Sequence, residues 1–229
     1  MLFRLGDLAS DPRALFWFLL AIVLAFLVGL TLHECSHALT AHLLGDDTAR
    51  WMGRLSLNPA RHLDPLGTLM ILFIGFGWAK PTPVNPRNLR VGPRAGMAWV
   101  SLAGPLANFA IAGIAALPIK LHAVQLVNSD YPQSGWTAGN YVAYLLIWMV
   151  AMNVLLGLFN LIPLAPLDGT KIFIALFPGE IGNFIARLEA YGPGVLFALL
   201  LIGSFIPGLN IFARLIGPLE ERILNLLLT

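Results

Sequence analysis

The stretch "ALFWFLLAIVLAFLVGLTLHECSH", residues 14–37, decides how this chain folds. Residues 14–32 carry no charge and match the ~20 apolar residues that a helix needs to cross about 30 Å of hydrocarbon. A secretory signal peptide has a shorter apolar region, of about 7–15 residues, that ends at a small-residue cleavage site. This stretch instead continues into HECSH and stays compatible with a helix to Gly45. We therefore expect a retained membrane helix.

The composition of the whole chain agrees with a membrane environment. Of the 229 residues, 58% are hydrophobic and 11% are charged, and the mean hydropathy is +0.78. Soluble domains are about a quarter charged. The net charge of +2 comes without a basic tract, so no nucleic-acid partner is expected. The single cysteine, Cys35, excludes an intramolecular disulfide framework.

Further apolar segments predict an all-α polytopic membrane protein. Residues 95–119 and 141–163 are each long enough to span. Residues 193–228 hold two apolar stretches broken by "IPGLN" at 206–210, which fits two short helices or one broken span followed by an interfacial helix. We expect about 4–6 transmembrane helices. They would form one integral-membrane domain over residues 1–229, with a core at 14–178 and C-terminal helices at 180–229.

The apolar segment at 66–79, "LGTLMILFIGFGWA", is too short for a helical span and contains three glycines. Apolar segments of about 10–14 residues are often re-entrant or interfacial. Non-helical backbone at membrane depth persists only where it is buried in protein or lines a watery cavity. A hairpin in this segment would therefore lie beside a site.

The distribution of charge predicts an orientation. Residues 80–94 carry Lys80, Arg87, Arg90 and Arg94 without an acidic residue, whereas the 120–140 connection has only Lys120 and Asp130. Under the positive-inside rule the 80–94 segment is cytoplasmic. The first helix then runs from outside to inside, so that its HECSH end lies toward the cytoplasm.

The H-E-x-x-H pattern in the first helix is typical of zinc proteases. On a helix His33 and His37 lie one turn apart on one face, where two imidazoles bind one metal and Glu34 acts as the general base toward water. The alternative is a pair of buried histidines at a helix contact. That alternative is weaker in a membrane, because ionisable groups there are costly and usually functional.

A catalytic zinc usually has three protein ligands, so a third ligand is expected from another segment. Asp168, in "NLIPLAPLDGTKI" at 160–172, follows a helix that returns to the cytoplasmic side. Pro163 and Pro166 are expected to end that helix and to direct Asp168 inward. An ordinary Asp-Gly turn is the competing explanation for this residue.

The chain resembles the site-2 protease family of intramembrane zinc metalloproteases. The resemblance rests on H33-E-C-S-H37, on "AGPLAN" at 103–108 and on N160-L-I-P-L-A-P-L-D168-G169, and it covers at least residues 14–178. "GRLSLNPARHLDPLGT" at 53–68 and "GWAKPTPVNPRNLR" at 77–90 are similar to minimal members, which lack a PDZ or CBS domain.

This resemblance implies the chemistry and the partners. It implies one zinc held by His33, His37 and Asp168, with Glu34 activating water, and a substrate cleaved within or near its own membrane helix. It also implies a membrane-embedded β-hairpin near 66–85 that receives an extended substrate. The protein would be a multi-pass protein of the cell membrane, engaged in regulated intramembrane proteolysis.

Asn108 and Asn160 are the other polar positions of the family's motifs. Each is an uncharged group suited to holding a substrate backbone or polarising its carbonyl. Helix packing explains them equally well, since Gly104, Asn108 and Ala112 recur every four residues as a small-residue face. Asn153 is interpreted as a packing residue.

Two other classes of protein are alternatives to the protease. A histidine–carboxylate site in a membrane also suits a metal-ion transporter, which needs further ligands along a path, and the spans offer few. A non-catalytic membrane scaffold is the other alternative, and the intact zinc-binding set disfavours it.

Overall fold

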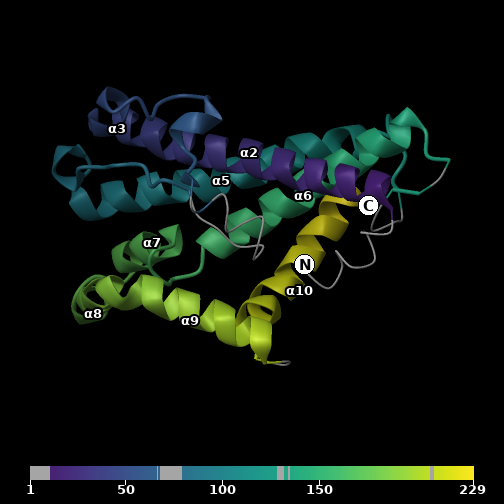
Figure 1. Ribbon diagram of the computed structural model, residues 1–229. Coiled ribbons are helices and arrows are strands. Elements are labelled where there is room, and N and C mark those ends of the chain that lie inside the picture. Colours follow the sequence, from purple (N-terminus) through teal and green to yellow (C-terminus); the bar gives the residue numbers. More distant parts are fainter. Residues whose placement is uncertain (1–10, 66, 68–78, 128–131, 134, 207–208) are drawn as a thin grey trace.

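The computed structural model describes residues 11–65, 67, 79–127, 132–133, 135–206 and 209–229 (Figure 1). Three long helices form its centre: α2 (Pro12–Leu43), α5 (Pro93–Lys120) and α6 (Ala138–Asn160). They run side by side in Figure 1, and each of the three contacts the other two. The sequence-predicted spans at 95–119 and 141–163 correspond to α5 and α6.

Local signals fix where these helices begin. The Asp11 carboxylate accepts hydrogen bonds from the backbone N–H groups of Arg13 (2.9 Å) and Ala14 (3.2 Å), which satisfies two free donors at the start of α2. Thr137 and Asn140 form a reciprocal capping box at the start of α6. Proline occupies the first turn of α2 and of α5, where its missing N–H costs nothing.

Small residues let the three helices approach closely. Gly104, Asn108 and Ala112 are all buried along α5, as the four-residue repeat predicts. Where α5 meets α6, a Cβ added at Gly157 would lie 3.0 Å from the Phe109 ring. Close packing of this kind holds helices together in lipid, where the hydrophobic effect between helices is absent.

Within the described part of the chain, four helical runs are long and apolar enough to cross a membrane: α2, α5, α6 and the run Glu180–Gly203. The fourth run contains α8 (Glu180–Leu188), η3 (Glu189–Tyr191) and most of α9 (Gly192–Phe205). The observed number agrees with the expected 4–6 helices. Of the two alternatives for residues 193–228, the structure has two helices, α9 and α10 (Ile211–Leu228).

The C-terminal helix α10 packs back onto the central helices (Figure 1). Its residues Ile223, Leu224 and Leu227 lie against a buried cluster that includes Ala112 of α5 and Val150 of α6. These apolar residues of α10 therefore pack against the central helices of the same chain.

The predicted β-hairpin near 66–85 is not supported. Residues 66 and 68–78 lie outside the described residues. The described residues contain no sheet, and residues 79–85 contain only an isolated antiparallel bridge between Leu63 and Ala79. Beside this bridge the Lys80 N–H donates a hydrogen bond to the His62 carbonyl oxygen at 2.7 Å.

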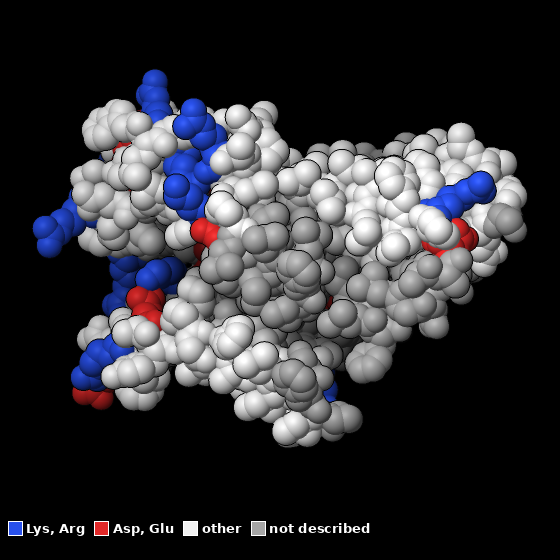
Figure 2. Space-filling view, viewed as in Figure 1, with Lys and Arg blue, Asp and Glu red and all other residues white. Residues whose placement is uncertain are grey.

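The basic side chains are unevenly distributed over the face shown in Figure 2. On the face shown in Figure 2, most Lys and Arg side chains lie at the end that carries the short helix α3 (Thr48–Trp51) and α8. The end of α2 and the start of α5 meet there, joined by a hydrogen bond from the Arg90 N–H to the Leu44 carbonyl oxygen at 2.8 Å. The HECSH end of α2 therefore lies near the basic end of the bundle.

Candidate metal centre

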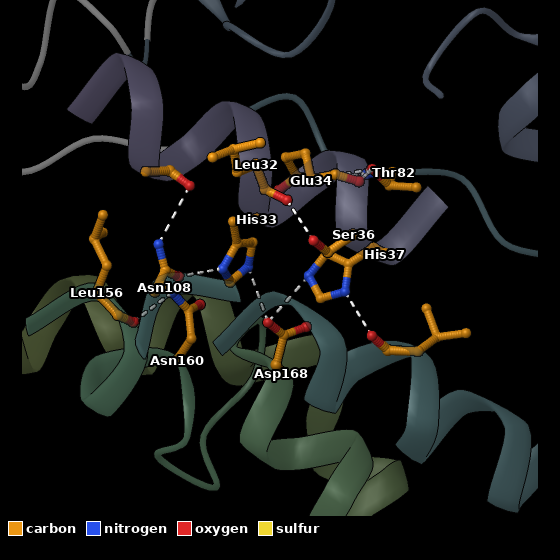
Figure 3. A network of polar contacts seen from close by, with 12 residues as sticks. Leu32, His33, Glu34, Ser36, His37, Thr82, Asn108, Leu156, Asn160 and Asp168 are labelled. Carbon is orange, nitrogen blue, oxygen red and sulfur yellow. Dashed lines mark hydrogen bonds and ion pairs between the residues drawn. The ribbon is translucent and has the colours of Figure 1, made fainter. Parts of the chain in front are cut away.

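Helix α2 presents three polar side chains toward the inside of the bundle. His33, Glu34 and His37 are 5%, 8% and 7% exposed, respectively, and the two imidazole centroids are 4.6 Å apart. His33 lies 10 residues before the end of α2 at Leu43, which corresponds to about 15 Å along the axis. Figure 3 shows the two rings turned toward Asp168.

Asp168 completes the cluster as the first residue of α7 (Asp168–Leu176). Its Oδ2 lies 3.1 Å from His33 Nε2 and 3.3 Å from His37 Nε2. The next residue has to be glycine, because a Cβ at Gly169 would collide with the carbonyl oxygens of Leu161 and Ile162. The Asp-Gly pair thus allows α7 to start against the end of α6, with the carboxylate facing the histidines.

The other ring nitrogen of each histidine is occupied. His37 Nδ1 donates to the Val100 carbonyl oxygen at 2.6 Å, and His33 Nδ1 donates to Asn108 Oδ1 at 2.7 Å. In a neutral imidazole the nitrogen without hydrogen is an acceptor. When both imidazoles are neutral, both Nε2 atoms therefore carry lone pairs, and both are directed at the Asp168 carboxylate.

Three acceptor atoms that face one another repel unless a cation, or a proton on one imidazole, lies between them. The ligand atoms of His33, His37 and Asp168 all lie within 4.8 Å of one another, and Asp168 Oδ2 is buried without a hydrogen-bond donor. Two imidazole nitrogens and one carboxylate oxygen are a donor set typical of catalytic zinc, with a fourth position left open. Among the residues that the structure describes, this is the one such group of three or more His, Cys, Asp and Glu side chains.

Gly104 of α5 lies against the same two histidines. A Cβ at this position would lie 2.5 Å from His37 Nε2 and 2.6 Å from His33 Nε2. A side chain here would occupy the space where the ligand atoms converge. The glycine in "AGPLAN" thus keeps this space free beside the two histidines and also allows close helix packing.

Glu34 contacts a residue that the sequence reasoning did not single out. Its Oε2 accepts hydrogen bonds from the Thr82 hydroxyl (2.6 Å) and from the Thr82 N–H (3.0 Å), as Figure 3 shows. Both bonds go to one carboxylate oxygen. The signal available in the sequence was a hydroxyl residue within "KPTPVNP", next to a segment expected to lie beside a site.

The segment 79–90, which carries Thr82, is held by polar side chains from the 44–65 region. Arg54 donates to the carbonyl oxygens of Lys80 (2.9 Å) and Pro81 (2.8 Å). Asp46 accepts from the Asn85 N–H at 2.6 Å and from the Asn88 amide at 2.9 Å. Burial raises the pKa of Asp46, but hydrogen bonds from Thr48, Asn85 and Asn88 outweigh it and hold this pKa below its ordinary value.

The two asparagines predicted to bind substrate differ in their surroundings. Asn108 is fully buried, and its amide is bonded to His33, to the Gly29 carbonyl oxygen (3.2 Å) and to Asn153 Oδ1 (2.9 Å). Asn160 is half-buried and donates to the Leu156 carbonyl oxygen of its own helix at 3.0 Å. Substrate binding stays a prediction for both residues. Within the cluster, the observed contact of Asn108 is its hydrogen bond to the His33 ring.

Comparison with known proteins points to one family. Residues 118–203, which include Asp168, match the sequence profile of peptidase family M50. A Bacillus subtilis protein named "Putative zinc metalloprotease YwhC" is 40% identical over 194 residues, which cover 82% of this chain and 85% of that protein. No solved structure matches the chain significantly.

Mycobacterial relatives carry a similar name. A Mycobacterium tuberculosis protein named "Putative zinc metalloprotease Rip2" is 30% identical over 162 residues, covering 69% of this chain and 58% of that protein. A protein of the same name from Mycolicibacterium smegmatis is 27% identical over 194 residues, covering 82% and 68%, respectively. The chain belongs to peptidase family M50, the site-2 protease family of metalloendopeptidases.

Proposed function

We propose that this protein is an intramembrane zinc endopeptidase that hydrolyses a peptide bond within or beside a membrane segment of its substrate. The observation that carries the proposal is the convergence of Asp168 on His33 and His37, which lie with Glu34 in a helix that is apolar enough to span a membrane. A site about 15 Å from the helix end suits a substrate that is itself embedded in lipid.

His33, His37 and Asp168 would hold one zinc ion per chain through two nitrogens and one oxygen. When bound, zinc supplies Lewis-acid chemistry, which makes water more acidic and polarises a carbonyl group. His33 and His37 are buried side chains, and Asp168 is the first residue of α7. The three ligand atoms would therefore be held close together before the substrate arrives.

Glu34 would move the proton. As water oxygen bonds to the scissile carbonyl carbon, Glu34 takes the water proton and later transfers it to the departing nitrogen as the C–N bond breaks. Thr82 occupies Oε2 of Glu34, which leaves Oε1 for this transfer. Asn160 would bind the substrate backbone.

The physiological setting follows from the same features. The basic end of the molecule would face the cytoplasm, and the site would open toward that side of the cell membrane. A membrane-embedded protein or peptide would be the substrate, and the cleavage would be a step of regulated intramembrane proteolysis.

A set of three proteins tests the mechanism: wild type, Glu34→Gln and His33→Ala, each purified and assayed with a single-span test substrate. Glu34→Gln should retain zinc and lose activity by about 10²–10⁴-fold, the usual contribution of a general base. His33→Ala should lose zinc. Undiminished cleavage by Glu34→Gln would falsify the mechanism, and zinc uptake into proteoliposomes without peptide cleavage would favour a transporter.

A further inference from the structure

Asn153, in the middle of α6, is a fully buried amide. A buried amide costs free energy unless its donors and acceptor are satisfied. Its Oδ1 accepts from Asn108 Nδ2 at 2.9 Å, and its Nδ2 donates to the Met149 carbonyl oxygen at 2.9 Å. It therefore connects the backbone of α6 to the residue that holds His33.

The direction of these hydrogen bonds is fixed by two backbone carbonyl groups. The Met149 carbonyl oxygen is only an acceptor, so the group of Asn153 that faces it must be the NH2, and Asn153 Oδ1 then faces Asn108. The Gly29 carbonyl oxygen is likewise only an acceptor, so it faces the NH2 of Asn108 at 3.2 Å. Both contacts of Asn108 Nδ2 demand the same orientation of this amide.

That orientation decides which tautomer His33 adopts. Because Asn108 Oδ1 faces the ring at 2.7 Å, His33 Nδ1 must carry the hydrogen and Nε2 must carry the lone pair. A flipped Asn108 amide would present hydrogens to Nδ1, place the ring hydrogen on Nε2 and remove the lone pair needed for a metal. His37 needs no such arrangement, since its Nδ1 bonds directly to the Val100 carbonyl oxygen.

Helix α2 leaves room for Asn153. A Cβ at Gly29 would lie 2.8 Å from Asn153 Oδ1 and 3.0 Å from Leu156 Cδ1. Gly29 thus supplies both the carbonyl oxygen that orients Asn108 and the space that Asn153 occupies. The three helices contribute to one connected group: Gly29 from α2, Asn108 from α5 and Asn153 from α6.

We propose that Asn153 is a positioning residue that acts through Asn108 to hold His33 in the tautomer able to bind the metal. The inference rests on the proposed zinc site. It adds to the packing role expected from the sequence a control of metal affinity, exerted without contact with metal or substrate. Partners of this kind beyond the ligands typically contribute 10–100-fold to metal affinity.

The test compares Asn153→Leu and Asn153→Asp in the purified full-length protein, by zinc competition with a chromophoric chelator. Leucine keeps the volume but removes the acceptor for Asn108, so zinc binding should weaken by roughly 10–100-fold. Protonated aspartate keeps a donor toward the Met149 carbonyl oxygen and an oxygen acceptor facing Asn108, so this variant should stay within a few-fold of wild type. A role in packing alone predicts the opposite order, because leucine is the better residue for a buried apolar position.

Nitrogen-15 NMR of the apo protein labelled at histidine gives a second readout, independent of zinc and activity. His33, assigned through His33→Ala, should be in the Nδ1–H form in wild type and a mixture in Asn153→Leu. Asn140→Leu is the matched control, since it removes a capping bond from the same helix and should lower Tm without changing zinc affinity.

The outcomes separate this inference from the proposed function. If wild type binds no zinc, the proposed function fails and the inference with it. If wild type binds zinc and Asn153→Leu binds it equally well with an unchanged His33 tautomer, the inference alone is overturned. Equal losses in the leucine and aspartate variants would also overturn it, because the acceptor would then be irrelevant.

Discussion

At the scale of single residues, the clustering of His33, His37 and Asp168 could be predicted from the sequence, and the contacts that support these residues could not. The i, i+4 spacing of His33 and His37 is a local property, since helix geometry alone places both on one face. Asp168 could be predicted from its depth and from the direction of its helix. Thr82 and Asn153 form hydrogen bonds to residues 48 and 45 positions away, respectively, and no periodicity in the sequence records such bonds.

Thr82 should increase the turnover of the enzyme by holding Glu34. Thr82→Val keeps the shape and the N–H bond but removes the hydroxyl that donates to Oε2. A hydrogen bond to a charged group is worth about 1.5–3 kcal/mol, so kcat should fall roughly 10- to 100-fold with zinc content and KM little changed. Steady-state kinetics with the single-span substrate measure this effect.

Thr82→Ser should recover most of the lost kcat, because serine restores the donor. Thr40→Val makes the same change on α2 outside this hydrogen-bond group and serves as the control. Equal kcat for wild type and Thr82→Val would show that the contact has no part in turnover. Loss in the serine variant as well would point to packing of the methyl group instead.

At the scale of elements, the spans were predictable and the segment between the first two was not. Long apolar runs define α2, α5 and α6 because lipid requires every backbone group to bond within its own helix. The 44–65 region and the 79–90 segment are held instead by side chains such as Arg54 and Asp46, whose partners are backbone groups far along the chain. Apolar periodicity carries no information on those contacts.

The close approach of α5 to α2 leads to a prediction at Gly104. Alanine is favoured over glycine in a helix by about 1 kcal/mol, so Gly104→Ala should not weaken α5 itself. The new methyl carbon would nevertheless lie 2.5–2.6 Å from the ligand nitrogens of His37 and His33. We expect at least a roughly tenfold loss of zinc affinity, the scale reported for disturbed ligand surroundings. Zinc competition at equal protein concentration measures it.

Gly113→Ala is the matched control for this variant. It lies on the same helix, and a Cβ there meets no atom within 4 Å, so zinc affinity should stay at the wild-type value. If Gly104→Ala and Gly113→Ala bind zinc equally well, the histidine rings have room to move away, and Gly104 serves helix packing only.

At the scale of the whole molecule, the fold places a polar site inside an apolar bundle and a basic surface at one end. The sequence predicts successive spans that cross the membrane in alternating directions, and this predicts the relative directions of the helices. The return of α10 along α6 does not follow from it, because an amphipathic helix packs equally well on a lipid surface or on a protein face. The contact of Ile223 and Leu224 with the central cluster depends on tertiary packing, which the local sequence pattern does not determine.

The orientation of the bundle in the membrane is the last prediction. Lys80, Arg87, Arg90 and Arg94 flank the start of α5, and the positive-inside rule predicts that they lie in the cytoplasm. Single cysteines in a Cys35→Ser background should report this: Val91→Cys at the basic end and Leu121→Cys at the other end, both at exposed positions. A membrane-impermeant maleimide should label Leu121→Cys in intact cells and Val91→Cys only after permeabilisation. The parent Cys35→Ser should stay unlabelled throughout, and the reverse pattern would place the metal centre nearer the outer surface, where the proposed cytoplasmic-side cleavage could not occur.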